Sequence, residues 1–159
     1  MSFTVQAQMT PKGTIESFEH KQSSIYPGTE RSVKVYVPQQ YDGAKPACLL
    51  VCMDGILYDA AAKIDTLIAR GDMPVAIGVF VEPGVVRDAV GEVVRYNRCR
   101  EFDTVDGTWA RFLETEILPQ VEGRKLADGR VVHISTDAND RAITGASSGG
   151  ICALSLIHI

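Results

Sequence analysis

An alternating pattern of apolar and polar residues marks the N-terminal quarter of the chain. Residues 31–37 alternate strictly, and residues 13–21 alternate more loosely, as expected of two half-buried strands. Turn-forming residues at 26–29 lie between them. The pattern therefore predicts an antiparallel ribbon over 13–38 at the edge of a sheet. Residues 1–12 are polar, and we expect them to be loosely ordered.

Continuous apolar runs and helical spacing follow the ribbon. Residues 47–53 and 75–81 are apolar almost throughout, which is typical of strands covered on both faces. Residues 60–70 have the composition and spacing of a helix that ends at Gly71. Residues 109–121 show helical spacing as well. We assign no element to the long polar segment at 85–108, and only a short strand or loop to 131–140.

The order of these elements predicts the fold class. Strands and helices alternate after the ribbon, and the strands are apolar on both sides, which is typical of an α/β protein. We expect an N-terminal antiparallel ribbon leading into a mostly parallel sheet with helices on both faces, in one domain over residues 1–159. Ligands bind such sheets beyond the carboxyl ends of the strands.

One motif near the C-terminal end carries chemistry. A short apolar run enters Gly145-Ala-Ser-Ser-Gly149, and small and apolar residues follow. This is the G-x-S-x-G nucleophile elbow, in which a serine lies on a tight turn between a strand and a helix. Side chains two positions before and after the serine would collide with neighbouring backbone, so both are glycine. The register centred on Ser148 has alanine at the first of these positions, and a Gly/Ser-rich loop would lack the strand–turn–helix order. Both features favour Ser147 as the nucleophile.

Composition excludes several other classes. The chain is 45% hydrophobic and 23% charged with a formal net charge of -4, so we expect a globular protein that does not bind nucleic acid. No apolar run approaches the ~20 residues that span a membrane, and no signal-peptide pattern is visible, so we expect a cytoplasmic protein. The four cysteines are scattered and form no metal-binding spacing.

Five stretches of the chain resemble the enterochelin-esterase-like branch of the α/β-hydrolases, and they occur in that family's order. They are Tyr26–Arg31 with Val35–Pro38, Leu50–Gly55, Gly71–Phe80, Tyr96–Asp103 and Arg141–Gly150. The resemblance implies hydrolysis of small-molecule carboxylic esters, siderophore-type or other, through an acyl-enzyme on Ser147, without a metal or organic cofactor. It also implies an oxyanion hole made by the backbone N–H groups of Ile56 and Ser148.

The sequence departs from this family after the serine. The family's catalytic acid and histidine follow the nucleophile in chain order, but only twelve residues follow Ser147 here. His20 lies in the predicted ribbon, His133 precedes the elbow, and His158 lies far along the helix that follows it. Residues 154–159 also look non-native. We therefore expect an incomplete α/β-hydrolase, the inactive N-terminal part of a longer enzyme. The alternative is a genuine short protein that ends in an apolar helix.

Two other function classes remain to be weighed. A non-catalytic α/β binding or interaction domain could keep the elbow without the chemistry. A serine peptidase is disfavoured, because no histidine or aspartate motif precedes the serine. The sequence leaves the oligomeric state open.

The charged residues near the predicted site could bind substrate or could have a structural role. Arg98 and Arg100 follow a predicted strand end and could hold an anionic substrate group, with Asp54 and Gly55 contributing from the turn after residue 53. Alternatively, the arginines belong to an ion-pair network that braces a long loop, and Asp54 shapes its turn. Trp109 is expected in the core.

Overall fold

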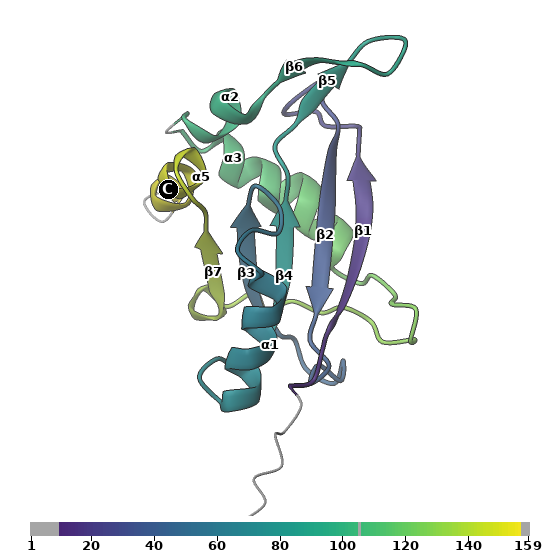
Figure 1. Ribbon diagram of the computed structural model, residues 1–159, viewed down its shortest axis with the longest axis vertical. Coiled ribbons are helices and arrows are strands. Elements are labelled where there is room, and N and C mark those ends of the chain that lie inside the picture. The colour runs from purple at the N-terminus through teal and green to yellow at the C-terminus, as the bar shows by residue number, and fades with distance from the viewer. Residues whose placement is uncertain (1–9, 105, 157–159) are drawn as a thin grey trace, which may run out of the picture.

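A five-stranded sheet with helices on both faces forms the centre of the molecule (Figure 1). The computed structural model describes residues 10–104 and 106–156. The order of strands in this sheet is β1-β2-β4-β3-β7. Their bounds are Thr14–His20 for β1, Arg31–Val37 for β2, Ala76–Val81 for β4, Cys48–Met53 for β3 and Arg141–Thr144 for β7.

The predicted ribbon is confirmed. β1 pairs antiparallel with β2, from Thr14 opposite Val37 to His20 opposite Arg31, and β1 forms one edge of the sheet. β2 also pairs antiparallel with β4, whereas β4, β3 and β7 run parallel to one another. The ribbon thus leads into a parallel half, and the carboxyl ends of β3 and β7 lie side by side.

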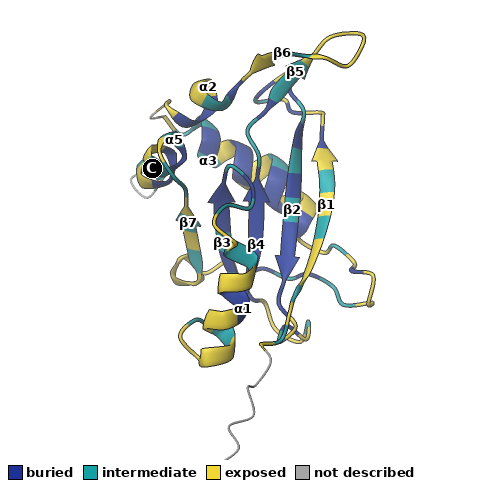
Figure 2. Ribbon diagram, viewed as in Figure 1, coloured by how far each residue is buried: buried dark blue, intermediate teal, exposed yellow. Residues whose placement is uncertain are grey.

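The central strands are buried on both faces, as their continuous apolar sequences predict. Every residue of β4 is buried (Figure 2). In β3, Leu49, Val51 and Met53 join the larger core cluster, on the side of the helical segment 108–121. Cys52 belongs to a second cluster, which also contains Ile64 of the helix α1 (Ala60–Arg70). Helices therefore cover both faces of the sheet, which confirms the α/β class.

Helix α1 matches its predicted bounds. It ends at Gly71, whose φ of 75° lies in the left-handed region and whose N–H donates to the Ile68 carbonyl. The second predicted helix is more complex: α3 (Thr108–Phe112) continues through a π-helical segment, η1 (Leu113–Ile117), into α4 (Leu118–Val121). Pro119 has no N–H to donate, and the Leu118 N–H bonds to the Leu113 carbonyl, five residues back. Trp109 lies in the core, as predicted.

The segment 85–108, for which the sequence predicts no element, contains a hairpin and a short helix. The hairpin pairs β5 (Val85–Arg87) with β6 (Val93–Tyr96), and α2 (Arg98–Phe102) follows it. The hairpin projects from the body of the molecule, and β6 is mostly exposed, so its sequence lacks the apolar face by which strands are recognised (Figure 1). Residues 131–140 contain only isolated bridges and a 3₁₀ turn, η2 (Ala138–Asp140).

β7 forms the second edge of the sheet in the described part of the chain, because β3 is its one neighbour there. The following helix, α5 (Ser148–Leu156), exposes Ile151 by 52% and Leu154 by 60%. An open strand edge beside exposed apolar side chains favours self-association. We expect the isolated 159-residue chain to elute from gel filtration as a broad, concentration-dependent peak. A sharp monomeric peak with cooperative melting would contradict this expectation.

Candidate active site

The predicted strand–turn–helix order is found at the serine. β7 ends at Thr144 and α5 begins at Ser148, so Ser147 lies in the turn that joins them. Ser147 is exposed, and its φ of 54° lies in the left-handed region. The left-handed conformation destabilises a serine by about 1–3 kcal/mol, so contacts with the surrounding structure must stabilise it. The turn therefore presents a strained, accessible serine at the carboxyl end of a strand.

Close approaches explain both glycines of the motif: backbone atoms lie against Gly145, and the side chains of Asp54 and Met53 lie against Gly149. A Cβ added at Gly145 would lie 2.4 Å from the carbonyl carbon and oxygen of Gly149. A Cβ added at Gly149 would lie 2.9 Å from Asp54 Oδ2 and 3.0 Å from Met53 Cβ. Neither position can hold a side chain without movement of its neighbours. The steric requirement thus falls two residues before and two after Ser147, the spacing of an elbow centred on this residue.

A substitution at Gly145 tests this steric requirement. Gly145→Ala is expected to lower the free energy of unfolding by about 3 kcal/mol, because the clash is with backbone atoms that cannot rotate away. A matched control is Gly28→Ala, since nothing lies within 4 Å of that Cβ and only its φ of +76° opposes the change. Its cost should be about 1 kcal/mol. Urea titrations that give equal losses for the two variants would contradict the steric account.

A second turn lies next to the elbow. It follows β3, whose Cys52 pairs with Thr144 of β7, and it begins with Asp54 at a φ of 65° and Gly55 at a φ of 74°. The Gly55 N–H donates to the Val81 carbonyl at 3.3 Å, which ties the turn to the end of β4. The next residue, Ile56, packs against the core cluster beneath α1. The turn is therefore anchored both to the end of β4 and to the core cluster beneath α1.

Two backbone donors in these turns, the Ile56 N–H and the Ser148 N–H, form no backbone hydrogen bond with the residues that the structure describes. One belongs to the turn after β3, and the other to the first residue of α5. Backbone N–H groups at the beginning of a helix favour negative charge, and a pair of donors from two loops can bind an oxyanion.

Arg98 joins the two turns. Its Nε and Nη2 donate to the Asp54 carboxylate at 2.5 and 2.8 Å, and Nη2 also donates to the Ala146 carbonyl at 3.3 Å. The hydrogen bond to Asp54 raises the pKa of the Arg98 guanidinium. Of the four candidate binding residues, Asp54, Gly55 and Arg98 thus come together at the elbow.

Arg100 points elsewhere. It lines a separate pocket of about 210 Å³ with Arg95, Asn97 and residues 25–27. Arg98 and Arg100 are two positions apart on α2, and side chains with this spacing do not share a helix face. The two arginines therefore do not act on one group in this structure.

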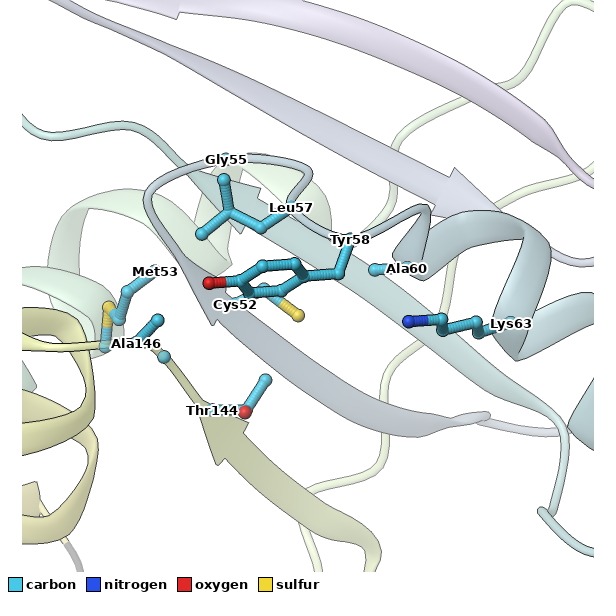
Figure 3. Close-up of a pocket in the computed structure, with 10 residues that line it drawn as sticks. Cys52, Met53, Gly55, Leu57, Tyr58, Ala60, Lys63, Thr144 and Ala146 are labelled. Carbon is cyan, nitrogen blue, oxygen red and sulfur yellow. The ribbon is translucent and has the colours of Figure 1, made fainter.

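A small pocket lies between the two turns and the start of α1 (Figure 3). It has a volume of about 240 Å³, and its lining includes Gly55, Leu57, Tyr58, Lys63 and Ala146. In Figure 3 the Lys63 amine points toward the space between Tyr58 and Thr144. Tyr58 and Lys63 cannot be identified from the sequence as pocket residues, since an exposed tyrosine and a lysine on a helix form no recognisable motif.

The thiol beside this pocket is not activated. Burial raises the pKa of Cys52 to about 12, and burial likewise raises the pKa of Cys152, on α5, to about 12. Nucleophilic cysteines need the thiolate, which a raised pKa disfavours. Neither cysteine therefore competes with the serines of the elbow as a nucleophile.

The two histidines in the described residues have partners away from the elbow. His20 lies on β1 and bonds to Glu116 at 3.1 Å and Gln120 at 2.8 Å. β1 and β7 are opposite edges of the sheet, about 19 Å apart at ~4.8 Å per strand. His133 bonds to Glu122 at 2.7 Å. Residues 157–159, which include His158 and form half of the tail at 154–159 that looks non-native, lie outside the described residues.

Residues 10–104 and 106–156 contain neither a metal-binding cluster nor a membrane-spanning helix. No group of three or more His, Cys, Asp or Glu side chains there could hold a metal ion. None of the helices in this part of the chain is both long and apolar enough to cross a membrane.

Comparison with known families and structures gives a consistent result. A family model described as "Putative esterase" matches residues 24–158. No curated protein matches the chain.

Several solved structures share the fold. They include a ferulic acid esterase (21% identity, TM-score 0.56, covering 90% of this chain and 52% of that one). A CE1 ferulic acid esterase from the anaerobic fungus Anaeromyces mucronatus has 19% identity and a TM-score of 0.60, with 92% and 53% covered. The enterobactin and salmochelin hydrolase IroE has 18% identity and a TM-score of 0.56, with 88% and 55% covered. The chain spans about half the length of these structures.

Proposed function

The chain belongs to this esterase family, in an enterochelin-esterase-like branch of the α/β-hydrolases, and we propose that it carries the nucleophile and oxyanion hole of a serine ester hydrolase. The observation that carries the proposal is the exposed Ser147 at a φ of 54°, between the end of β7 and the start of α5. A side chain at position 145 or 149 would lie too close to neighbouring atoms, which favours glycine at both. This is the geometry of the nucleophile elbow that presents the serine in α/β-hydrolases.

The proposed mechanism uses both turns. A histidine takes the Ser147 proton, and the alkoxide attacks the ester carbonyl carbon. The oxygen that becomes negative accepts hydrogen bonds from the Ile56 and Ser148 amides. The alcohol leaves with a proton from the histidine, and an acyl group remains on Ser147. Water, activated by the same histidine, then releases the acid.

The histidine and the acid that orients it are proposed to come from sequence outside these 159 residues. Neither His20 nor His133 bonds to the elbow, and the matched part of this chain covers only 52% and 53% of two structural relatives. The proposed substrates are small carboxylic esters. The names of the structural relatives, ferulic acid esterases and an enterobactin hydrolase, suggest aromatic and siderophore esters as the first to try.

Two assays test the proposal. The 159-residue chain should hydrolyse p-nitrophenyl acetate no faster than its Ser147→Ala variant, because removing triad members costs roughly 10⁴ to 10⁶ in rate. Turnover that Ser147→Ala abolishes would show that the chain already contains its base. The longer gene provides the second test: an Asp or Glu followed by a His within about 100–150 further residues supports the enzyme. Their absence would favour a binding domain that retains the elbow.

A further inference from the structure

The Arg98 side chain forms hydrogen bonds with both turns of the candidate site. Its guanidinium holds the Asp54 carboxylate with two hydrogen bonds and the Ala146 carbonyl with a third. Asp54 is two residues before the Ile56 amide, and Ala146 is directly before Ser147. A planar guanidinium bound at both Nε and Nη2 fixes the position of a carboxylate better than a point charge can.

Both turns contain a non-glycine residue in the left-handed region, Asp54 at 65° and Ser147 at 54°. Such conformations persist only where the surroundings hold them. The Asp54 carboxylate also lies against the first turn of α5, since a Cβ at Gly149 would be 2.9 Å from its Oδ2. Without a cation, this carboxylate would oppose a negative charge forming nearby. Arg98 therefore restrains the two strained turns and neutralises the carboxylate between them.

The helix that carries Arg98 is itself fixed in place. Glu101, three residues further along α2, is fully buried and accepts two hydrogen bonds from Arg31 at 2.9 Å each and one from the Gly84 amide at 3.0 Å. The Arg98 guanidinium also lies 5.5 Å from the ring centre of Phe102, which is buried. The Arg98 backbone is thus anchored to β2 and to the loop after β4, and its side chain reaches the elbow from a rigid base.

We propose that Arg98 is a positioning residue for ester hydrolysis, acting through Asp54 and the Ala146 carbonyl to hold the Ile56 amide and Ser147 in their relative places. The inference rests on the proposed function. Of the two roles that the sequence allows for Arg98, the inference favours an ion pair that stabilises the site over the binding of an anionic substrate.

The test uses the longer enzyme and p-nitrophenyl acetate, a neutral substrate that offers arginine no anionic group. Arg98→Met is expected to lower kcat about 10- to 100-fold with KM changed less than about threefold, because the loss is in the transition state. Arg98→Lys should recover part of kcat. Asp54→Asn should lower kcat as well, and the double variant should lose less than the product of the two single losses. Arg111→Met, which removes an exposed arginine on α3, should leave kcat unchanged.

The outcomes separate the inference from the function on which it rests. If Arg98→Met prevents folding, Asp54→Asn decides, since it conserves side-chain size. A kcat within twofold of the parent in folded Arg98→Met, or in Asp54→Asn where Arg98→Met does not fold, would overturn the positioning role, and so would a loss confined to KM for anionic esters. A parent enzyme whose turnover survives Ser147→Ala would instead refute the proposed function, whatever the Arg98 variants do.

Discussion

Replacing Ser147 with alanine in the longer enzyme is expected to lower kcat/KM for p-nitrophenyl acetate by about 10⁴- to 10⁶-fold. The loss is large because the serine forms the covalent intermediate, so its removal ends acyl transfer and leaves only the oxyanion hole and substrate binding. The elbow itself should survive, because alanine adds no atoms to the turn. Thermal melting of the variant should therefore match that of the parent.

Ser148→Ala separates the two possible registers of the motif. It removes the other hydroxyl but keeps the Ser148 backbone amide, and we expect it to reduce kcat/KM less than about tenfold. If Ser148→Ala were the more damaging of the two substitutions, the nucleophile would be Ser148. The glycine sterics, which fit positions 145 and 149, would then need another explanation.

The second large effect is expected at the buried ion pair beneath α2. Glu101→Gln should lower the free energy of unfolding by about 3–5 kcal/mol, because it leaves the Arg31 charge buried without a counter-ion. Both side chains of this pair are 0% exposed. Arg31 lies among the rings of Tyr26, Trp109 and Phe112, whose faces only partly compensate a buried cation.

An exposed ion pair provides the matched control. Glu114, whose side chain is 58% exposed, pairs with Arg141 at 2.9 Å, and Glu114→Gln should cost no more than about 1 kcal/mol. Urea titration followed by far-UV circular dichroism measures both variants. A loss below 1 kcal/mol for Glu101→Gln would mean that the Arg31 charge finds another partner, and the rigid base proposed for Arg98 would lose its main support.

Much of the sheet could be predicted because its signals are local. The alternation over 31–37 indicates a strand with one buried face. The unbroken apolar runs at 47–53 and 75–81 indicate strands that are buried on both faces. The C-terminal end of helix α1 can be predicted because glycine readily adopts the left-handed conformation that ends helices, as Gly71 does here. The strand, turn and helix around Ser147 could be predicted for a similar reason, since the glycine spacing reflects contacts made within the motif and with the adjacent turn.

The unpredicted elements depend on distant residues. The hairpin β5–β6 exposes most of β6, so no apolar periodicity marks it. The five-residue helix α2 is held by Glu101, whose partners Arg31 and Gly84 are 70 and 17 residues away. The ion pair between Arg98 and Asp54 likewise joins residues that are far apart in the sequence, by 44 positions. A sequence pattern can indicate that charges are clustered, but it does not say which of them meet.

The central claim is that Ser147 is the residue that attacks the substrate. Treating the longer enzyme with a fluorophosphonate, whose phosphorus is attacked by an activated serine and whose oxygen occupies the oxyanion hole, tests it most directly. Peptide mass spectrometry should find one adduct, on Ser147, formed faster in the parent than in Arg98→Met. An adduct on Ser148 or on another residue, or no adduct in an enzyme that still hydrolyses esters, would contradict the account.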